Sequence, residues 1–493
     1  MRVALVVPPL VSRANDVLGS GIYYMPYTMA YLAGRLREAG HSVAVHDMFA
    51  AAPRRIVRVP PMMNQGIAAE DLPGRFSQPP EAVFVFAWAV TSFKVIGQIA
   101  RALRGRFPDV PIIVVENSQA VTGMSLAQVA PDLLAEGTDY LILGECEERA
   151  VALLDHIAGK GGMPADGWAR IENGAPRVVP ADSTIADLDA LPFPAWDLFP
   201  LEAYWRLGYA HGPQEGNYLA ILTSRGCPFG CKFCVVPSTN HRRWRARSAE
   251  SVYREMCHLY ETLGVREFHF EDVNPTTREQ RLVELAGLIR ANHKPFIWKF
   301  ASGTKIETIS LEGLRAMAAG GCSYVSFSPE TGSDRVLKLM GKPFDRAHAL
   351  DQTKEMARLG VASQAVFLIG FPGETDDDRV QTEKYMAELI RAGLDEVLIL
   401  IVSPVPGSAI FDQFSGYGDY SELTFSPTWR DDYAVLEAWQ KRLYRRFFLL
   451  KAIHQPLKCC GHAMNVIRRR FKTKMEMTFW RWAIVKRAMR GAQ

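Results

Sequence analysis

Short apolar runs alternate with helical patterns along two long stretches of this chain, residues 1–155 and 217–404. A short apolar run predicts a buried strand, and the periodic segment behind it predicts a helix. A strand–helix–strand order favours a parallel sheet, because the crossover helix returns the chain to the same end of the sheet. The chain is therefore expected to be an α/β protein with two sheet-bearing domains.

The first stretch predicts five strands with three helices between them. The strands are expected at residues 3–7, 42–46, 82–86, 112–115 and 140–143, and the helices at 29–38, 94–106 and 126–134. This pattern is typical of a Rossmann-like, doubly wound parallel sheet, which binds ligands at the carboxyl ends of its strands. No G-x-G-x-x-G motif follows the first strand, so the sequence does not favour a dinucleotide.

The second stretch predicts six strands and five helices. The strands are expected at 218–223, 267–271, 296–301, 324–328, 365–369 and 396–402, and the helices at 249–263, 279–291, 311–319, 347–359 and 376–392. In barrels built from such units the loops at the carboxyl ends carry the chemistry. Between the two stretches, residues 156–216 have weak periodicity and dense prolines, so they are expected to form an extended linker.

Three cysteines follow the first expected strand of the second stretch, with the spacing C-x3-C-x2-C: Cys227, Cys231 and Cys234. Glycine and proline break this segment, so three thiolates can turn toward one point, as an iron–sulfur cluster requires. A [4Fe-4S] cluster held by three cysteines keeps one iron free of protein ligands, where a small molecule can bind. Two other interpretations remain open, namely structural thiols and a zinc site with His241 as a fourth ligand.

The number of cysteines and the first residues of the chain indicate the cellular compartment in which the protein is expected. Eight cysteines are few for 493 residues, which argues against a secreted disulfide framework and implies a reducing cytoplasm. Pro8 and Pro9 cut the first apolar run far below the length of a signal-peptide core or a membrane span. The protein is expected to be cytoplasmic and not to span a membrane.

The motif C-x3-C-x-aromatic-C after a strand, with Phe233 as the aromatic residue, resembles the radical S-adenosylmethionine (SAM) superfamily. A Rossmann-like domain directly upstream resembles the cobalamin-binding, B12-dependent (class B) radical SAM enzymes. The resemblance implies a cobalamin-binding domain at 1–155 and a partial (β/α)6, TIM-like radical SAM barrel at 217–404. It also implies three cofactors: a [4Fe-4S] cluster on the three cysteines, SAM and cobalamin.

The same resemblance suggests which strand-end residues contact SAM. Asp272 ends the second barrel strand together with Glu271, and the segment S-P-E-T-G after the fourth strand resembles the family's G-I-E-S-G. The segment G-F-P-G-E after the fifth strand resembles the one beside the adenine. The candidate contacts are Phe233, Asp272, Glu330, Gly370, Pro372 and Gly373. An acid at a strand end can instead be a helix cap or a solvated charge.

Two further segments of the barrel are candidate contacts. Arg245 and Arg247 match the family's R-x-R context and, with their basic neighbours, would neutralise phosphate or carboxylate groups. A solvated basic face is the alternative. Residues 303–305 follow the third strand and could also contact a ligand.

The cobalamin contacts implied by the resemblance are Thr91 and Ser92 after the third strand of the first domain, and Gly144 and Glu145 after the fifth. The chain departs from the family pattern in two ways. It has no D-x-H-x-x-G motif, so no histidine ligand to cobalt is proposed, and residues 116–117 are Glu-Asn where Gly-Gly is usual. A retained fold without a corrin is therefore the alternative.

The C-terminal region, residues 405–493, is expected to be helical and basic. Helices are expected at 431–453 and 464–490, where aromatic residues are interleaved with Lys and Arg. From residue 441 onward there are fifteen Lys and Arg against one acid, Glu476, so this segment carries +14 and the rest of the chain −10. Such helices can pack as a cap or substrate lid with a solvated basic face, or contact an anionic membrane surface peripherally. Nucleic acid is less favoured, because no known nucleic-acid module is present.

The expected function is reductive cleavage of SAM at the cluster, used to methylate an unactivated carbon of a small or lipid-like metabolite. A reductase such as flavodoxin or ferredoxin would supply the electron. The first alternative is a cyclase, oxidase or rearrangement enzyme of the same architecture, similar to the magnesium-protoporphyrin ester cyclase branch. The second is a redox protein whose cluster only stores electrons. The sequence assigns no catalytic side chain and no substrate.

Overall fold

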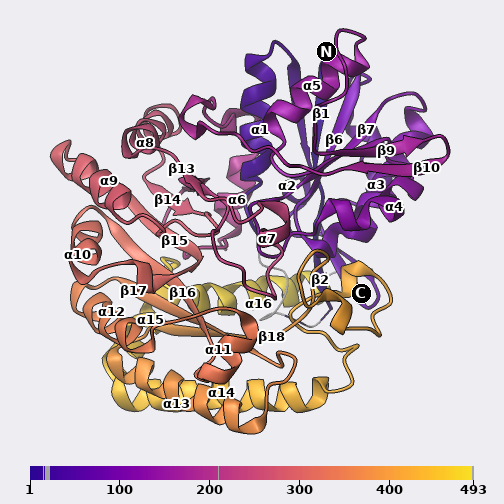
Figure 1. Cartoon of the computed structure of the whole chain (residues 1–493). Helices are drawn as coiled ribbons and strands as arrows, with labels where there is room; N and C mark the ends of the chain where they lie inside the picture. Colours follow the sequence, from indigo (N-terminus) through magenta and orange to yellow (C-terminus); the bar gives the residue numbers. More distant parts are fainter. Residues whose placement is uncertain (15, 17–22, 209, 491–493) are drawn as a thin grey trace.

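The first sheet is built on five parallel strands in the order β3-β1-β6-β7-β8 (Figure 1). The structure is a computed structural model that describes residues 1–14, 16, 23–208 and 210–490. The strands are β1 (Arg2–Val7), β3 (Ser42–Asp47), β6 (Ala82–Ala87), β7 (Ile112–Glu116) and β8 (Tyr140–Ile142). All five expected strands are confirmed. In a doubly wound sheet of this order the crevice for a ligand opens where the winding reverses, beside β1 and β6.

Helices cover both faces of this sheet because alternate strand residues point to opposite sides. Helices α1 (Tyr27–Glu38) and α5 (Glu147–Ile157) pack on one face with Val3 and Leu5. Helices α3 (Phe93–Arg106) and α4 (Leu126–Ala135) pack on the other face with Ala4 and Val6. The expected α/β, doubly wound fold class is therefore confirmed.

The expectation of a linker at 156–216 is wrong for part of that segment. Strands β9 (Trp168–Glu172) and β10 (Ala175–Val179) form a hairpin that extends the first sheet, with β9 antiparallel to β8. Asn173 and Gly174 form its turn with φ values of 51° and 77°. Asn-Gly favours this two-residue turn because both positions need positive φ. A separate three-stranded sheet, β2 (Leu10–Arg13), β5 (Met62–Gln65) and β4 (Ile56–Val59), was not expected.

The second sheet contains six parallel strands in sequence order, as a partial barrel requires (Figure 1). They are β11 (Tyr218–Ile221), β14 (Glu267–Phe270), β15 (Ile297–Thr304), β16 (Cys322–Glu330), β17 (Ala362–Ile369) and β18 (Glu396–Ile401). The five expected helices are also present: α8 (Ala249–Leu263), α9 (Gln280–Ala291), α10 (Leu311–Ala319), α12 (Arg346–Leu359) and α13 (Asp376–Ala392). Helix α11 (Asp334–Met340) is an additional helix between β16 and α12.

Several short elements join these units. They are α2 (Met48–Ala51), α6 (Leu201–Leu207), α7 (Val236–Thr239), β12 (Ser224–Arg225) and β13 (Arg245–Ala246). Strands β12 and β13 pair antiparallel on either side of the cysteine segment. They therefore close the loop that holds the three cysteines.

The C-terminal region forms three helices, α14 (Tyr433–His454), α15 (Pro456–Arg468) and α16 (Lys474–Arg490). The expected single helix over 464–490 is wrong, because Arg469 adopts a left-handed conformation with φ 54°. After this break the backbone N–H of Phe471 donates to the carbonyl of Gln214 at 3.0 Å, which attaches α16 to the segment before β11. Across the described residues, every helix falls short of the length or apolar character needed to cross a bilayer.

Candidate functional site

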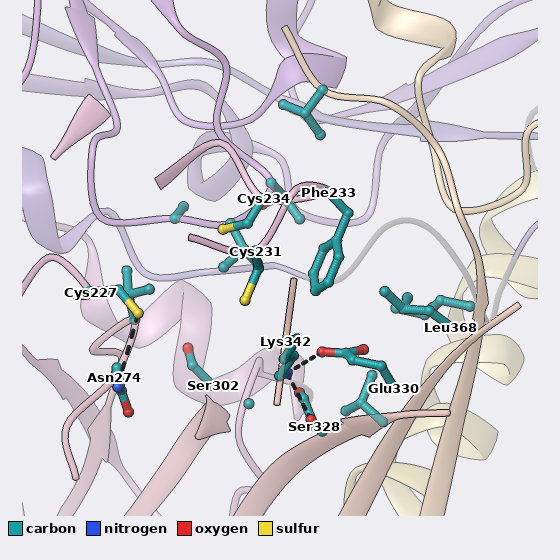
Figure 2. Close-up of a pocket in the computed structure, with 18 of the residues that line it drawn as sticks. Cys227, Cys231, Phe233, Cys234, Asn274, Ser302, Ser328, Glu330, Lys342 and Leu368 are labelled. Carbon is teal, nitrogen blue, oxygen red and sulfur yellow. Dashed lines mark hydrogen bonds and ion pairs between the residues drawn. The ribbon is translucent and has the colours of Figure 1, made fainter. Parts of the chain in front are cut away.

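Cys227, Cys231 and Cys234 line one cavity between the carboxyl edge of the barrel and the carboxyl edge of the first sheet (Figure 2). All three are unpaired thiols. Gly226, just before the first cysteine, has φ 77°, and a Cβ there would lie 2.1 Å from the carbonyl oxygen of Arg243. Only glycine therefore allows the chain to enter the cysteine loop at this angle.

The three thiols suit a polynuclear cluster better than a single ion. Within the described ranges, no three Cys, His, Asp or Glu side chains converge closely enough to hold one metal ion, so the zinc interpretation has no support. Sulfurs spread around a shared cavity match ligands to separate irons of one cluster. Burial raises the pKa of all three thiols, so the positive charge of bound iron is needed to hold them as thiolates.

Asp272 lies outside the cavity and braces the start of the cysteine segment. Its carboxylate accepts hydrogen bonds from the backbone N–H of Thr223 at 3.0 Å, the Thr223 hydroxyl at 2.8 Å and the Ser224 hydroxyl at 2.6 Å. The carboxylate is fully buried beneath the loop. Its hydrogen bonds favour a positioning role over direct contact with SAM.

Asn274 lies beside the cluster cysteines, whereas the sequence pattern pointed only to the acids at this strand end. Its side-chain amide Nδ2 is 4.0 Å from the sulfur of Cys227 (Figure 2). Asn274 also lines the cavity. An amide donor at this place stabilises negative charge on the Cys227 sulfur.

Glu330 and Phe233 lie in the same cavity as the cysteines, as the sequence predicted, together with Lys342 (Figure 2). The Lys342 ammonium pairs with the Glu330 carboxylate, donates to the carbonyl of Ser328 at 2.7 Å and lies 5.9 Å from the centroid of the Phe233 ring. Burial raises the pKa of Glu330, although Lys342 opposes this effect. Sequence patterns missed Lys342 because it follows the additional helix α11.

Lys305 supplies a second positive charge to the cavity, in the segment 303–305 that the sequence marked as a candidate contact. Its ammonium lies 4.4 Å from the centroid of the Phe229 ring and 2.5 Å from a carboxylate oxygen of Glu307. Two lysines thus lie beside the cysteine loop, each paired with an acid, Lys342 with Glu330 and Lys305 with Glu307. This arrangement can bind both the carboxylate and the ammonium of an amino-acid ligand.

The loop after β7 forms the wall that faces the cysteines. Gln119 accepts a hydrogen bond from the backbone N–H of Gly226 at 2.9 Å and donates to the side chain of Asn240 at 2.9 Å. Tyr27 donates to the carbonyl of Gln119 at 3.2 Å. The first domain lines the cavity with Tyr24, Tyr27, Gln119, Ala120, Val121 and Thr122. Gln119, Ala120, Val121 and Thr122 were not singled out from the sequence, because they lie in irregular backbone between β7 and α4.

The four expected cobalamin contacts lie outside this cavity. Ser92 is buried and donates to the carbonyl of Ala89 at 2.6 Å, and Thr91 borders a smaller hollow. The N–H of Gly144 donates to Glu116 at 2.5 Å, and Glu145 forms an ion pair of 2.6 Å with Arg245. These contacts hold the loops of the first domain in place, so any role toward a corrin stays a prediction.

At the carboxyl edge of the first sheet, one residue fits a bound corrin and another departs from the family pattern. The indole N–H of Trp88 is buried without a hydrogen-bond partner among the described residues, and its ring lies 6.1 Å from that of Tyr24. An amide-bearing macrocycle would supply the missing acceptor. At the end of β7, Glu116 accepts from the N–H groups of Leu126 and Gly144, so its side chain fills space that glycines would leave open.

Two arginines join the two domains through buried ion pairs, and a third belongs to a buried ion pair that contacts the first domain through Tyr31. Arg225 pairs with Glu147 at 2.6 Å, and Arg245 pairs with Glu145. Arg247 pairs with Glu255, whose carboxylate also accepts from Tyr31 of α1 at 3.1 Å. The R-x-R pair is therefore not a solvated face, and both of its members already have carboxylate partners.

A buried histidine, His211, also lines the cavity. His211 lies 2.6 Å from Glu271 through Nδ1 and 3.4 Å from the ammonium of Lys474 through Nε2. Tyr24 packs on its ring with centroids 4.0 Å apart. Burial lowers the pKa of His211 to about 4, so its imidazole is neutral near pH 7. Sequence reasoning missed His211 because it lies in irregular backbone before β11.

Most of the remaining cavity wall is apolar, with the serines Ser302, Ser328 and Ser403 as its polar side chains. The apolar part comes from β17, β18 and the loops that follow β18, with Val366, Leu368, Leu400, Val402, Val405 and Phe425. Gly370, Pro372 and Gly373 lie just beyond β17 but do not line the cavity. Gly370 instead packs against α14, where a Cβ would lie 2.5 Å from Leu436 Cδ1.

Comparison with known proteins agrees with this arrangement. Residues 221–386 match the family described as the Radical SAM superfamily. An uncharacterized methyltransferase, PH0819, of Pyrococcus horikoshii is 27% identical over 437 residues, which cover 87% of this chain and 86% of that protein. Cytidylyl-2-hydroxyethylphosphonate methyltransferase of Streptomyces wedmorensis is 29% identical over 51% of this chain, and the match spans about half of that protein, 48%.

The solved structures share the two-domain architecture. The radical S-adenosylmethionine methyltransferase TsrM of Kitasatospora setae, with cobalamin and a [4Fe-4S] cluster bound, aligns with a TM-score of 0.62. The alignment covers 84% of this chain and 74% of TsrM at 17% identity, a level that shows a common fold. Residues 221–386 therefore form a radical SAM domain, and the whole chain, with its Rossmann-like domain before the barrel, shares the fold of TsrM.

Proposed function

We propose that this protein methylates an unactivated carbon of a small or lipid-like metabolite, using a [4Fe-4S] cluster, SAM and cobalamin. The observation that carries the proposal is one cavity in which the three cysteines face the carboxyl edge of the first sheet. A cluster on one wall and a corrin on the other would share one substrate space. The methyltransferase names of the relatives from Pyrococcus horikoshii and Streptomyces wedmorensis favour methyl transfer over cyclisation or rearrangement.

The residues divide between holding cofactors and shaping the space between them. Cys227, Cys231 and Cys234 would hold the cluster, while Lys342 and Glu330 would meet the carboxylate and ammonium of SAM. When bound, the reduced cluster supplies the electron that cleaves SAM, and cobalamin serves as the methyl carrier. The wall that the first domain contributes, made of Tyr24, Tyr27 and residues 119–122, would support the corrin.

The apolar wall would hold the body of the substrate and keep water away from a reactive radical. Aliphatic side chains of β17 and β18 offer van der Waals contact and exclude water. His211 is one of the polar groups that line this space, so it would orient a substrate that carries a hydrogen-bonding group. A substrate that is mostly apolar fits this lining.

Two partners belong to the same proposal. A small reductase such as flavodoxin or ferredoxin would deliver the electron, because the chain needs a low-potential donor for the cluster. Contact of the basic C-terminal helices with a membrane surface would suit a lipid-like substrate, and their exposed side chains support it.

An anaerobic assay with label in the methyl group of SAM tests the function. The reconstituted protein would be incubated with hydroxocobalamin, a reductant, trideuteromethyl SAM and an apolar extract of the producing cells. The proposal expects both 5′-deoxyadenosine and S-adenosylhomocysteine, with a trideuterated product in the extract. Corrin binding with 5′-deoxyadenosine but without S-adenosylhomocysteine would point to the cyclase or rearrangement alternative. The matched control is Cys459→Ala/Cys460→Ala, which leaves the cluster cysteines intact.

A further inference from the structure

The C-terminal helices carry most of the large apolar side chains that the described chain exposes to solvent. Nine of the eleven strongly exposed ones lie between residues 433 and 490. They are Val435, Phe448, Leu449, Ile453, Leu457, Met464, Ile467, Phe479 and Trp482. Single exposed apolar side chains are common on proteins, but a concentration on consecutive helices marks an interaction surface.

Helix α15 shows this most clearly, because it has no fully buried residue. It contacts α14 and α16, and Leu457 and Ile467 are 87% and 75% exposed. Leu457, Cys460, Met464 and Ile467 follow helical spacing, so they share one face of the helix. That face is exposed along its length although its residues are apolar.

The end of α14 adds to the same surface. Phe448, Leu449 and Ile453 are 48%, 53% and 61% exposed, and α14 runs almost directly into α15 at Pro456. Phe447 and Leu450 of the same turns are buried against the barrel. The outward residues of α14 are therefore a second apolar stripe rather than part of the core.

The same helices and the loop after α15 also carry positive charge, and part of it is unneutralised. Arg445, Arg468, Arg470 and Lys472 are exposed and have no carboxylate partner among the described residues. Glu476, the only acid from residue 441 onward, is buried and accepts hydrogen bonds from the side chains of His462 and Asn465. The surface thus combines exposed aliphatic groups with free cationic groups.

Aromatic–cation pairs complete the pattern on α16. Lys486 lies 4.3 Å from the centroid of the exposed Trp482 ring, and Arg469 lies 4.4 Å from that of Trp480. Tryptophan beside Lys or Arg is the composition of side chains at a membrane–water boundary. Phe479, 58% exposed, lies one helical turn from Trp482.

We infer that an anionic phospholipid bilayer covers this surface, with the apolar side chains of α14 and α15 in the headgroup–acyl boundary. The inserting set is Phe448, Leu449, Ile453, Leu457, Met464 and Ile467, and the basic set is Arg445, Arg468, Arg470 and Lys472. Lipid phosphates complement the basic set and acyl chains complement the inserting set. A nucleic acid would leave the apolar groups in water, and a second copy of the chain would bring like charges together.

Flotation of the full-length apoprotein with vesicles tests this inference, and binding does not depend on cofactors or activity. We expect binding to vesicles of phosphatidylcholine with phosphatidylglycerol, weakening as salt is raised and as phosphatidylglycerol is removed. Leu457→Glu/Ile467→Glu should reduce the bound fraction at least about tenfold, since two charges enter the boundary. Arg468→Gln/Arg470→Gln should weaken binding to the anionic vesicles only. The matched control is Ile171→Glu, an exposed apolar position on β9, which should bind like the native chain.

Three results would overturn the inference. The first is equal binding of the native chain and Leu457→Glu/Ile467→Glu. The second is no vesicle binding but tight, salt-sensitive binding of an RNA oligonucleotide. The third is no vesicle binding but a concentration-dependent dimer that Leu457→Glu/Ile467→Glu abolishes. Circular dichroism and thermal midpoints would show that each variant remains folded. Methyl transfer without vesicle binding would leave the proposed function standing.

Discussion

Gln119, in the loop after β7, accepts a hydrogen bond from the backbone N–H of Gly226, the residue directly before Cys227. The same side chain donates to Asn240 beyond the cysteine segment. One residue of the first domain thus holds both ends of the loop that carries the cysteines. The distance between the cluster wall and the first-domain wall is therefore set by direct contacts and does not depend on a flexible linker.

The buried ion pair between Arg225 and Glu147 should be a major stabilising contact between the domains. Their side chains are 6% and 2% exposed. Removing one partner of a buried pair costs roughly 3–5 kcal/mol because the other charge is left without its neighbour. Glu147→Ala should lower the free energy of unfolding in urea by about 3 kcal/mol, since Glu145 still lies 3.8 Å from Arg225.

The control for that experiment is the exposed pair of Arg206 and Glu202, whose side chains are 79% and 65% exposed. Glu202→Ala should change the stability by less than about 1 kcal/mol, because surface ion pairs contribute little. Equal effects of Glu147→Ala and Glu202→Ala would show that the interdomain pair does not stabilise the native state.

Gly370 should be needed for the packing of α14 on the barrel. Its φ is 79°, and a Cβ would lie 2.5 Å from Leu436 Cδ1. Gly370→Ala should lower the free energy of unfolding by about 2–3 kcal/mol, through the left-handed backbone and overpacking together. Gly360→Ala is the matched control, because Gly360 has φ 73° with nothing within 4 Å of the new Cβ. It should cost only about 1 kcal/mol, and an equal loss in the two variants would contradict the role assigned to Gly370.

Lys474 should make stability depend on pH in the alkaline range. Burial lowers its pKa to about 8 from the usual 10.5. Between these values the unfolded chain holds a proton that the native chain has lost, so stability rises with pH. Lys474→Arg keeps its charge throughout. The stability of the native chain relative to this variant should therefore increase by about 1–3 kcal/mol from pH 8 to 10.5. A difference that stays constant in urea titrations across this range would refute the prediction.

Lys342 should determine how tightly SAM binds. Its ammonium is the buried cation beside Glu330 and the cysteine loop. Lys342→Met should raise the dissociation constant for SAM at least about tenfold, because a charge-assisted hydrogen bond is lost. Equilibrium dialysis with the cluster-reconstituted protein measures this constant. Lys338→Met, at an exposed position on α11, should bind SAM normally. The same affinity in Lys342→Met and the native chain would exclude the assigned contact.

The β/α order of both domains was predictable because it rests on local periodicity. Each of the eleven strands expected in the two sheets is present. The cysteine motif predicted that the three thiols would turn toward one point, and they line one cavity. The hairpin of β9 and β10 was predictable in principle, because Asn173 and Gly174 favour such a turn. It was missed because its strands are short and mostly not buried, so they lack a clear hydrophobic periodicity.

The rest of the site depends on tertiary contacts that periodicity does not report. Lys342 and His211 reach the cavity from irregular backbone, and Gln119 contributes through the docking of one domain on the other. Asp272 shows the opposite case. A strand-end acid resembled a ligand contact, but backbone and hydroxyl donors of the cysteine segment already occupy its oxygens.

Iron bound after anaerobic reconstitution tests the central claim most directly. The native chain should bind about four irons per protein and, once reduced, give the electron paramagnetic resonance signal of a [4Fe-4S] cluster. Its spectrum should change when SAM is added, because one iron lacks a protein ligand. Cys227→Ala/Cys231→Ala/Cys234→Ala should bind no iron, whereas Cys459→Ala/Cys460→Ala should match the native chain. An unchanged iron content in the triple variant would contradict the account.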